Sequence, residues 1–455
     1  MEALIDLLPA LMFVALGGLL FTGLPVAFVV GGVGLAFAVV GIGVGEFRPM
    51  QFALITNRIF GGIVENLVLV AVPMFIFMGA MLEVSGIAKD LLRCLQVLMR
   101  RVPGGLALSV ALMGTIFAAT TGIIGASVVL LTLLALPVMV QRGYAQTLAS
   151  GTVAASGTLG ILIPPSIMLV VMGDLLSISV GTLFVAALVP GLMLSVFYVA
   201  YIAGIATLRP ALAPPMPASE GPQDLRGLIV MMARSFLPAV FLIVLVLGSI
   251  VGGFATPTEA SGIGAAGATL LAVVNRRLDL RTLDKVVEKT VLTTAMLFLI
   301  FVGATAFSYV FRVLGGEHMV IDFINAVGVG TWGILLVLMG IVFVLGFFFD
   351  WIEITLIVLP IFAPVVELLD FGEHVARGDV VYWFTVLVAI NLQTSFLTPP
   401  FGFALFYMKG AAPRSVAMSH IYRGIVPFVL LQLLALALVL AFPEIAMLLP
   451  NAVEG

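Results

Sequence analysis

The stretch GTLGILIPPSIMLVVMG, residues 157–173, decides how this chain folds. It is apolar enough for the interior of a membrane, yet it contains three glycines and the pair Pro164-Pro165. A proline pair removes two backbone donors and clashes with the preceding helical turn. We therefore expect a membrane crossing over residues 146–171 whose helix is broken near its middle.

Composition places the whole chain in a membrane. Of its 455 residues, 62% are hydrophobic and 9% are charged, which is too little polar surface for a water-soluble globule. Apolar runs of about 20 residues predict spanning helices, and the alternating pattern of a β-barrel is missing. The predicted fold is an all-α polytopic membrane protein with about ten transmembrane helices. The expected crossings are residues 5–22, 25–45, 66–84, 146–171, 183–205, 235–250, 258–275, 291–311, 381–408 and 424–445.

Two further apolar regions, residues 104–141 and 331–368, are each too long for one crossing and are bent near the middle by glycine or charge. We interpret them as re-entrant hairpins, which a bilayer tolerates only where the tip lies in protein or a water-filled cavity. Residues 1–207 then form a first half, residues 208–226 a Pro-rich linker, and residues 227–455 a second half.

The positive-inside rule orients this arrangement. With both termini outside, in the periplasm, 16 of the 20 Lys and Arg residues face the cytoplasm, and so does the linker. Arg100-Arg101 and the charged run at residues 276–289 are expected to lie at the membrane interface in contact with acidic lipid.

Self-comparison indicates an internal repeat. IFMGA at 76–80 recurs as IFVGA at 300–304, LMGTIF at 112–117 as LMGIVF at 338–343, and TLLALP at 132–137 as TLIVLP at 355–360. Pro164-Pro165 recurs as Pro399-Pro400, so residues 381–408 form a second broken helix. The proposed topology gives the halves opposite directions across the bilayer, which is the inverted-repeat design of secondary transporters.

The broken helices suggest cation binding, because carbonyls freed by proline need another partner in a bilayer. Sodium is a hard, oxygen-seeking ion that suits such carbonyls and the hydroxyl groups beside them. The candidate oxygen ligands in the breaks are Ser156, Thr158 and Ser166 in the first half and Asn391, Thr394, Ser395 and Thr398 in the second. The hairpin tips add Thr120, Thr121 and Ser127 in the first half and Asp350 and Glu353 in the second.

Asp350 is the strongest single candidate, because an ionisable residue within apolar sequence is a functional candidate by default. Its alternative role is to cap a half-helix. Glu353 lies one turn further on, where the pattern is equally compatible with a ligand and with exposure to solvent. Glu259, in TPTEA, is expected to cap a helix start.

Four motifs together resemble the DctM-like large membrane subunit of tripartite ATP-independent periplasmic (TRAP) transporters. They are GTLGILIPPS, NLQTSFLTPPFG, GGFATPTEA and GFFFDWIEITLIVLPIF, and they occur in the family's order along nearly the whole chain. The resemblance implies sodium-coupled uptake of organic acids by an elevator-type movement in the bacterial inner membrane. It also implies a small four-helix (DctQ-like) membrane subunit and a periplasmic solute-binding protein as partners.

Carried over by motif, the resemblance implies two sodium sites, with Na+ as the coupling ion and no covalent cofactor. The substrate is left open, although the residues after Asp350 resemble subtypes that handle 2-oxoacids or other monocarboxylates. The first site comprises Thr120, Thr121, Ser127, Ser156, Gly157, Thr158 and Gly160. The second comprises Asp350, Asn391, Thr394, Ser395 and Thr398, while Gly125, Ser166 and Glu353 would lie near the substrate.

Other functions fit less well. None of the four lysines follows a glycine, so the chain lacks the phosphate-binding loop of an ATP-driven pump. HExxH is absent, so the commonest metallohydrolase motif is missing and no enzymatic activity is expected. No nucleic-acid partner is expected either. A cation or organic-anion antiporter or channel, acting without a binding protein, remains the alternative.

Overall fold

The computed structural model describes residues 5–121, 124–217, 221–399 and 402–454, without the side chains of 118–121, 321, 323–327 and 454. Every regular element in these ranges is a helix. The helices of the first half are α2 (Leu8–Leu20), α3 (Val26–Val44), α4 (Gln51–Ile59), α5 (Ala71–Val84), α6 (Ile87–Leu98), α7 (Gly105–Thr121), α8 (Ile124–Leu134), α9 (Leu136–Gln141), α10 (Gln146–Thr158), α11 (Ile167–Leu175) and α12 (Val180–Leu208).

The second half repeats the order of the first. α5 to α12 have counterparts in α16 to α23, with the hairpin and the broken helix in the same places. Its helices are α13 (Leu225–Met231), α14 (Leu237–Val251), α15 (Pro257–Val274), α16 (Leu280–Val313), α17 (Gly316–Val327), α18 (Thr331–Leu345), α19 (Trp351–Glu353), α20 (Leu359–Glu367), α21 (Val380–Leu397), α22 (Phe403–Ala411), α23 (Met418–Ala441) and α24 (Glu444–Glu454).

Length and hydropathy identify seven possible membrane spans in the described residues, or eight if one bent pair counts as a span. The prediction of about ten is not confirmed by this criterion, because broken crossings fall into helices shorter than a full span. The bent pair joins Gln51–Val64 to Val68–Val84 at 57°. The sequence prediction for this region began only at residue 66, so it missed the first arm.

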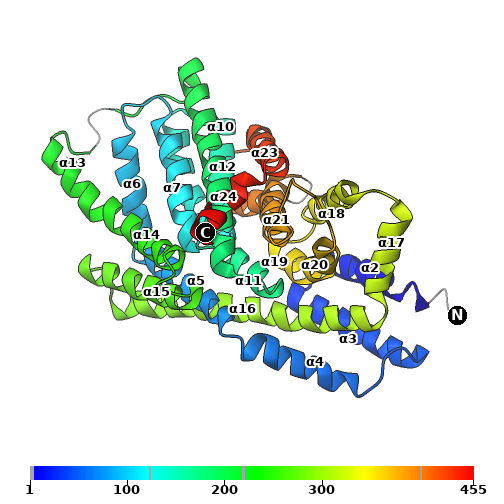
Figure 1. The fold of residues 1–455 in the computed structure, drawn as a ribbon. Helices are drawn as coiled ribbons and strands as arrows, with labels where there is room; N and C mark the ends of the chain where they lie inside the picture. Colours follow the sequence, from blue (N-terminus) through cyan, green and yellow to red (C-terminus); the bar gives the residue numbers. More distant parts are fainter. Residues whose placement is uncertain (1–4, 122–123, 218–220, 400–401, 455) are drawn as a thin grey trace.

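α16 runs along one side of the molecule, with α3 and α15 close to its two ends (Figure 1). It approaches α3 through glycine: a Cβ on Gly303 would lie 2.8 Å from the Ala27 carbonyl oxygen, and one on Gly34 would lie 2.9 Å from the Phe307 Cα. Small residues at such crossings let two backbones meet closely, which is the main source of helix association in lipid.

The two halves are interlocked. α10 packs against α23 of the second half, and α21 packs in turn against α12 of the first. At the first crossing, a Cβ on Gly424 would lie 2.1 Å from the Thr147 carbonyl oxygen. Each broken helix is thus held by a long helix from the opposite half.

The linker packs against the base of the first hairpin. The amide of Gly104 donates to the Ala213 carbonyl at 3.1 Å, and that of Ala145 donates to the Leu212 carbonyl at 2.9 Å. Arg100, which is only 4% exposed, donates to the Pro222 carbonyl at 2.9 Å. The expectation that Arg100 contacts lipid is therefore wrong, because its guanidinium holds the linker instead.

Glu259 caps α15 as predicted. Thr256 and Glu259 form a reciprocal capping box, in which the Glu259 carboxylate accepts from the Thr256 amide at 2.8 Å.

Candidate functional site

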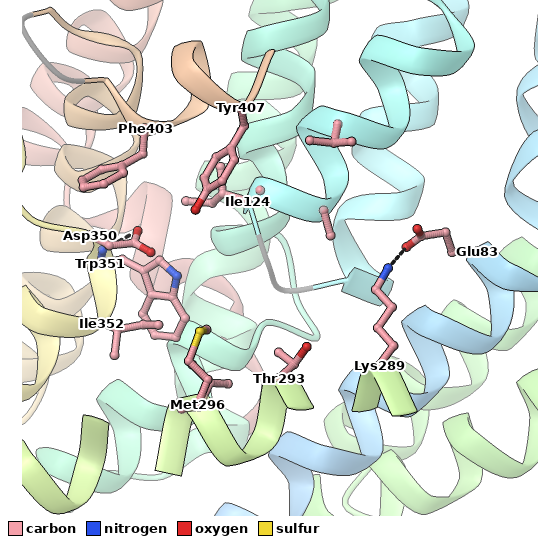
Figure 2. A pocket seen from close by; sticks show the side chains of 14 residues that line it. Glu83, Ile124, Lys289, Thr293, Met296, Asp350, Trp351, Ile352, Phe403 and Tyr407 are labelled. Atoms are coloured by element: carbon pink, nitrogen blue, oxygen red, sulfur yellow. Dashed lines mark hydrogen bonds and ion pairs between the residues drawn. The ribbon is translucent and has the colours of Figure 1, made fainter. Parts of the chain in front are cut away.

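Two helices begin at the wall of one cavity of about 400 Å³, α19 after its N-cap Asp350 and α22 after Gly402. The cavity lining includes the first two residues of α19, the first of α22, and Ile124, Gly125 and Ala126 of α8. α5 and α16 close the other side with Glu83, Lys289, Thr293 and Met296 (Figure 2). The cavity therefore lies where the two hairpins, the second broken helix and α16 meet.

Helix starts of this kind favour anions. The first backbone amides of a helix have no intrahelical acceptor, and the aligned peptide dipoles place a partial positive charge there. α22 is a 9-residue helix, and α19 continues through a π-helical turn into α20, so both have a macrodipole. The arrangement favours an anionic group inside the cavity.

Asp350 lies at this wall as the N-cap of α19. Its carboxylate accepts a hydrogen bond from the Trp351 amide at 2.8 Å. Phe403 and Tyr407 extend from α22 toward it (Figure 2). Asp350 thus caps α19, which is the alternative role considered from the sequence. Its side chain also faces the cavity, where it can bind a cation.

A second chamber of about 520 Å³ shares Met296, Asp350, Phe403 and Tyr407 with the first. Glu353 lies on its wall and is 5% exposed. Its Oε2 is buried without a hydrogen-bond partner among the described residues. The alternative that Glu353 is exposed to solvent is therefore wrong. A buried oxygen without a partner is costly, so this carboxyl is suited to take up a proton or a cation.

Part of the predicted first sodium site surrounds a very small cavity. Ser127, Ser156 and Gly157 line a void of about 10 Å³ together with Gly114. The Ser156 hydroxyl is buried and has no hydrogen-bond partner in the described structure. A void of this size admits about one water-sized occupant. The side chains of Thr120 and Thr121 lie outside the described residues.

The first helix break is shorter than predicted. Gly157 and Thr158 still belong to α10, Gly160 lies in a 3-10 turn, and α11 begins after Ser166. The Thr158 hydroxyl donates to the Ala155 carbonyl at 2.9 Å, as helical hydroxyls commonly do. The pair Pro164-Pro165 was expected to keep residues 157–163 from closing into a helix, and this is wrong for Gly157 and Thr158, because the α-helix ends only after Thr158.

Ser166 completes this break. Its hydroxyl donates to the Ile161 carbonyl at 2.6 Å and accepts from the Leu169 amide at 3.5 Å, so it caps α11. Pro164 and Pro165 are buried between the two arms. Ser166 thus satisfies one carbonyl that the prolines leave without a helical partner.

The residues predicted for the second sodium site make separate contacts in the described structure. The Asn391 amide donates to the Met339 carbonyl of α18 at 2.8 Å, and the Ser395 hydroxyl faces the Asn391 and Phe343 carbonyls at 3.3 and 3.5 Å. The hydroxyls of Thr394 and Thr398 donate to carbonyls of α21. Asn391 and Ser395 thus contact α18, and Asp350 lines the cavity. One sodium site shared by all of these residues stays a prediction.

The second break lies between Leu397 and Phe403. Pro399 is exposed within it, and Pro400 lies outside the described residues. Gly402 has a φ of +39°, in the left-handed region that glycine adopts readily, and it precedes the first residue of α22. This glycine directs α22 toward the cavity.

Pro165→Ala tests the first break. We expect slower transport, because alanine restores a backbone donor and removes the ring that opposes helix formation, a preference of about 3 kcal/mol per helical residue. The measurement is the initial rate of uptake in proteoliposomes, with the amount of folded protein checked by size-exclusion chromatography. Pro210→Ala, in the linker, is the matched control, and a normal rate in Pro165→Ala would contradict the broken-helix interpretation.

Sequence reasoning missed several cavity residues. Gly125 was predicted near the substrate and lines the cavity, but Glu83, Lys289 and Tyr407 were not singled out. Lys289 was assigned to the lipid interface with the rest of 276–289, which is wrong for this residue. The i, i+4 spacing of Lys289 and Thr293 could have indicated that both share one face of α16.

Comparison with known proteins agrees with this architecture. The fold resembles that of the Alcanivorax borkumensis YdaH transporter, with a TM-score of 0.62 at 14% identity over 90% of both chains. The two chains thus share one helical fold.

The sequence assigns the chain more narrowly. Residues 13–445 match the family model of the tripartite ATP-independent periplasmic transporter, DctM component, so the chain belongs to that family. It is 31% identical to the C4-dicarboxylate TRAP transporter large permease protein of Pseudomonas aeruginosa over 85% of this chain and 87% of that one. It is 28% identical to the sialic acid TRAP transporter large permease protein of Vibrio cholerae over 96% and 97%, respectively.

Proposed function

We propose that this protein is the large permease of a sodium-coupled transporter that imports an organic acid as its anion. The observation that carries the proposal is the meeting of two helix N-termini, those of α19 and α22, at one cavity of about 400 Å³. Peptide dipoles attract a carboxylate there without requiring an arginine at the same point. The role is transport rather than catalysis.

The family supports this assignment at the level of substrate class. One relative is named for C4-dicarboxylates and another for sialic acid, and both substrates carry carboxylate groups. Within that class, the apolar lining contributed by Met296, Trp351 and Phe403 favours a small acid with one charged end. A 2-oxoacid or another monocarboxylate meets this description.

Sodium coupling is the second part of the proposal. An anion entering beside Asp350 would be repelled unless a cation neutralised that carboxylate first. Sodium bound at Asp350 removes the repulsion, so ion and substrate each favour binding of the other. The unpartnered Ser156 hydroxyl beside the small void provides a place for a second ion.

The remaining parts of the proposal follow from the family. Its members act in tripartite systems, so we assign a small membrane subunit and a periplasmic solute-binding protein as partners. We also assign the bacterial inner membrane, both termini to the periplasm, and an elevator movement of the hairpin-containing part against α3 and α16. The inverted direction of the two halves belongs to this proposal.

The test is uptake by the permease reconstituted with both partners. Pyruvate, 2-oxobutyrate, succinate and sialic acid are offered with an inward sodium gradient, with equal sodium on both sides, and with potassium instead. We expect one acid to accumulate only with the sodium gradient. Accumulation with potassium alone would refute sodium coupling, and uptake without the binding protein would favour the antiporter.

A further inference from the structure

The cavity wall contains an ion pair between two helices. Lys289 of α16 and Glu83 of α5 are 2.6 Å apart, and both line the cavity that also contains Asp350 (Figure 2). Their side chains are 33% and 22% exposed, so they are partly shielded from solvent. Lys289 is the cationic side chain in this lining.

The Lys289 ammonium also has hydrogen-bond donors that no described residue accepts from. An ammonium group carries three donors, and in the described structure one of them is used, toward Glu83 Oε2. Thr293 lies one helical turn further along α16 and lines the same cavity, so its hydroxyl is available beside the ammonium. A small carboxylate needs two or three donors of this kind.

A second ion pair, between α6 and the connection from α15 to α16, provides the comparison. Arg277 and Asp90 are 2.7 Å apart, with side chains 42% and 39% exposed, and Arg277 also donates to the Ser85 carbonyl. This pair lies outside the cavity lining and uses its donors on the protein itself. The Arg277 guanidinium thus has two protein partners, Asp90 and the Ser85 carbonyl, whereas the Lys289 ammonium has one in the described structure.

We propose that Lys289 binds the carboxylate of the substrate and that Glu83 occupies the same donors when substrate is absent. The inference rests on the proposed function and names the residue that recognises the charge. Glu83 then acts as an internal competitor, so an entering anion displaces it from Lys289. The helix N-termini on the opposite wall complete the anion's surroundings.

If Glu83 competes with the substrate for Lys289, the two variants should change the affinity for a carboxylate in opposite directions. Lys289→Met removes the cation and should weaken carboxylate binding at least tenfold. Glu83→Gln removes the competing charge and should strengthen binding several-fold. If the pair only fastened α5 to α16, both variants would lower stability and neither would strengthen binding.

The experiment measures the melting temperature of the purified full-length permease in sodium, titrated with pyruvate or succinate at constant ionic strength. A ligand that binds the folded state raises this temperature, and the rise grows with the logarithm of one plus the ratio of ligand concentration to dissociation constant. Pyruvamide and succinamide have a similar size but no carboxylate charge, so they test whether the response depends on that charge. Arg277→Met is the control for loss of an ion pair.

We expect wild type and Arg277→Met to respond alike to at least one carboxylate and to neither amide. Glu83→Gln should respond at lower concentration, and Lys289→Met only at concentrations at least tenfold higher. A wild-type response in Lys289→Met, or a lost response in Glu83→Gln, would overturn the inference. If Lys289→Met does not fold, the inference is decided by Glu83→Gln alone: a response at lower carboxylate concentration supports it, and a lost response overturns it. Absence of any response in wild type would overturn the inference while reconstituted uptake, if intact, still supported the proposed function.

Discussion

Asp350→Asn is expected to abolish sodium-dependent uptake while leaving the protein folded. Asparagine is as good an N-cap as aspartate and keeps an oxygen for the Trp351 amide, so α19 should still begin in the same place. What is lost is the negative charge on the cavity wall. Without it, a bound cation loses its ionic ligand, and uptake with a sodium gradient should fall to the level without one.

The control for this variant is Asp224→Asn. Asp224 caps α13 by accepting from the Gly227 amide at 2.9 Å, far from the cavity lining. It should transport as wild type, which separates loss of the charge in the cavity from a general effect of replacing a capping carboxylate. Unchanged sodium dependence in Asp350→Asn would remove Asp350 from the ion site.

Gly424→Ala is expected to destabilise the protein, in contrast to Gly262→Ala, which adds the same methyl group elsewhere. The new Cβ would lie 2.1 Å from the Thr147 carbonyl oxygen and 3.0 Å from the Gly151 amide nitrogen. Both are backbone atoms, so α10 and α23 must separate. Overpacking of this kind costs about 1–3 kcal/mol and sometimes more. The measurement is the melting temperature and the yield of monodisperse protein.

Gly262→Ala, within α15, is the matched control because its Cβ would have no atom within 4 Å. It should stabilise the protein by about 0.5–1 kcal/mol, since alanine loses less backbone entropy than glycine in a helix. Both substitutions replace glycine with alanine, yet Gly424→Ala should lower the melting temperature and Gly262→Ala should raise it. Equal melting temperatures would mean that α10 and α23 do not pack as closely as described.

The breaks in the helices could be predicted from sequence because their cause is local. A proline pair opposes helix formation whatever surrounds it, so 164–165 identified the interruption between α10 and α11. The exact start of the break could not be predicted. Gly157 and Thr158 remain helical because α10 is packed on both sides, by α7 and α23, and that packing depends on the tertiary fold.

The cavity itself could not be predicted, because it is made where helices distant in sequence meet. Lys289 is part of a charged run that is typical of a lipid interface, and only the position of α5 places Glu83 beside it. The first arm of the bent pair was missed for a similar reason. Asn57 and Arg58 interrupt its apolar run, and the structure shows them lining another cavity of about 600 Å³.

Asn66 illustrates a contact that sequence could not indicate. It lies at the bend between Gln51–Val64 and Val68–Val84 and donates to both carboxylate oxygens of Asp174, at 2.8 and 2.9 Å. Asp174 belongs to α11, the second arm of the first broken helix. One polar contact therefore connects the two interrupted segments of the first half.

The meeting of two helix starts at the cavity has a consequence for how such a permease can change its substrate. Attraction supplied by peptide dipoles is built into the backbone, so it discriminates by sign of charge and survives most changes of side chain. Discrimination by size and shape depends instead on Met296 and Phe403, which line the cavity. Substitutions at these two positions can therefore alter which acid fits without dismantling the attraction for acids as a class.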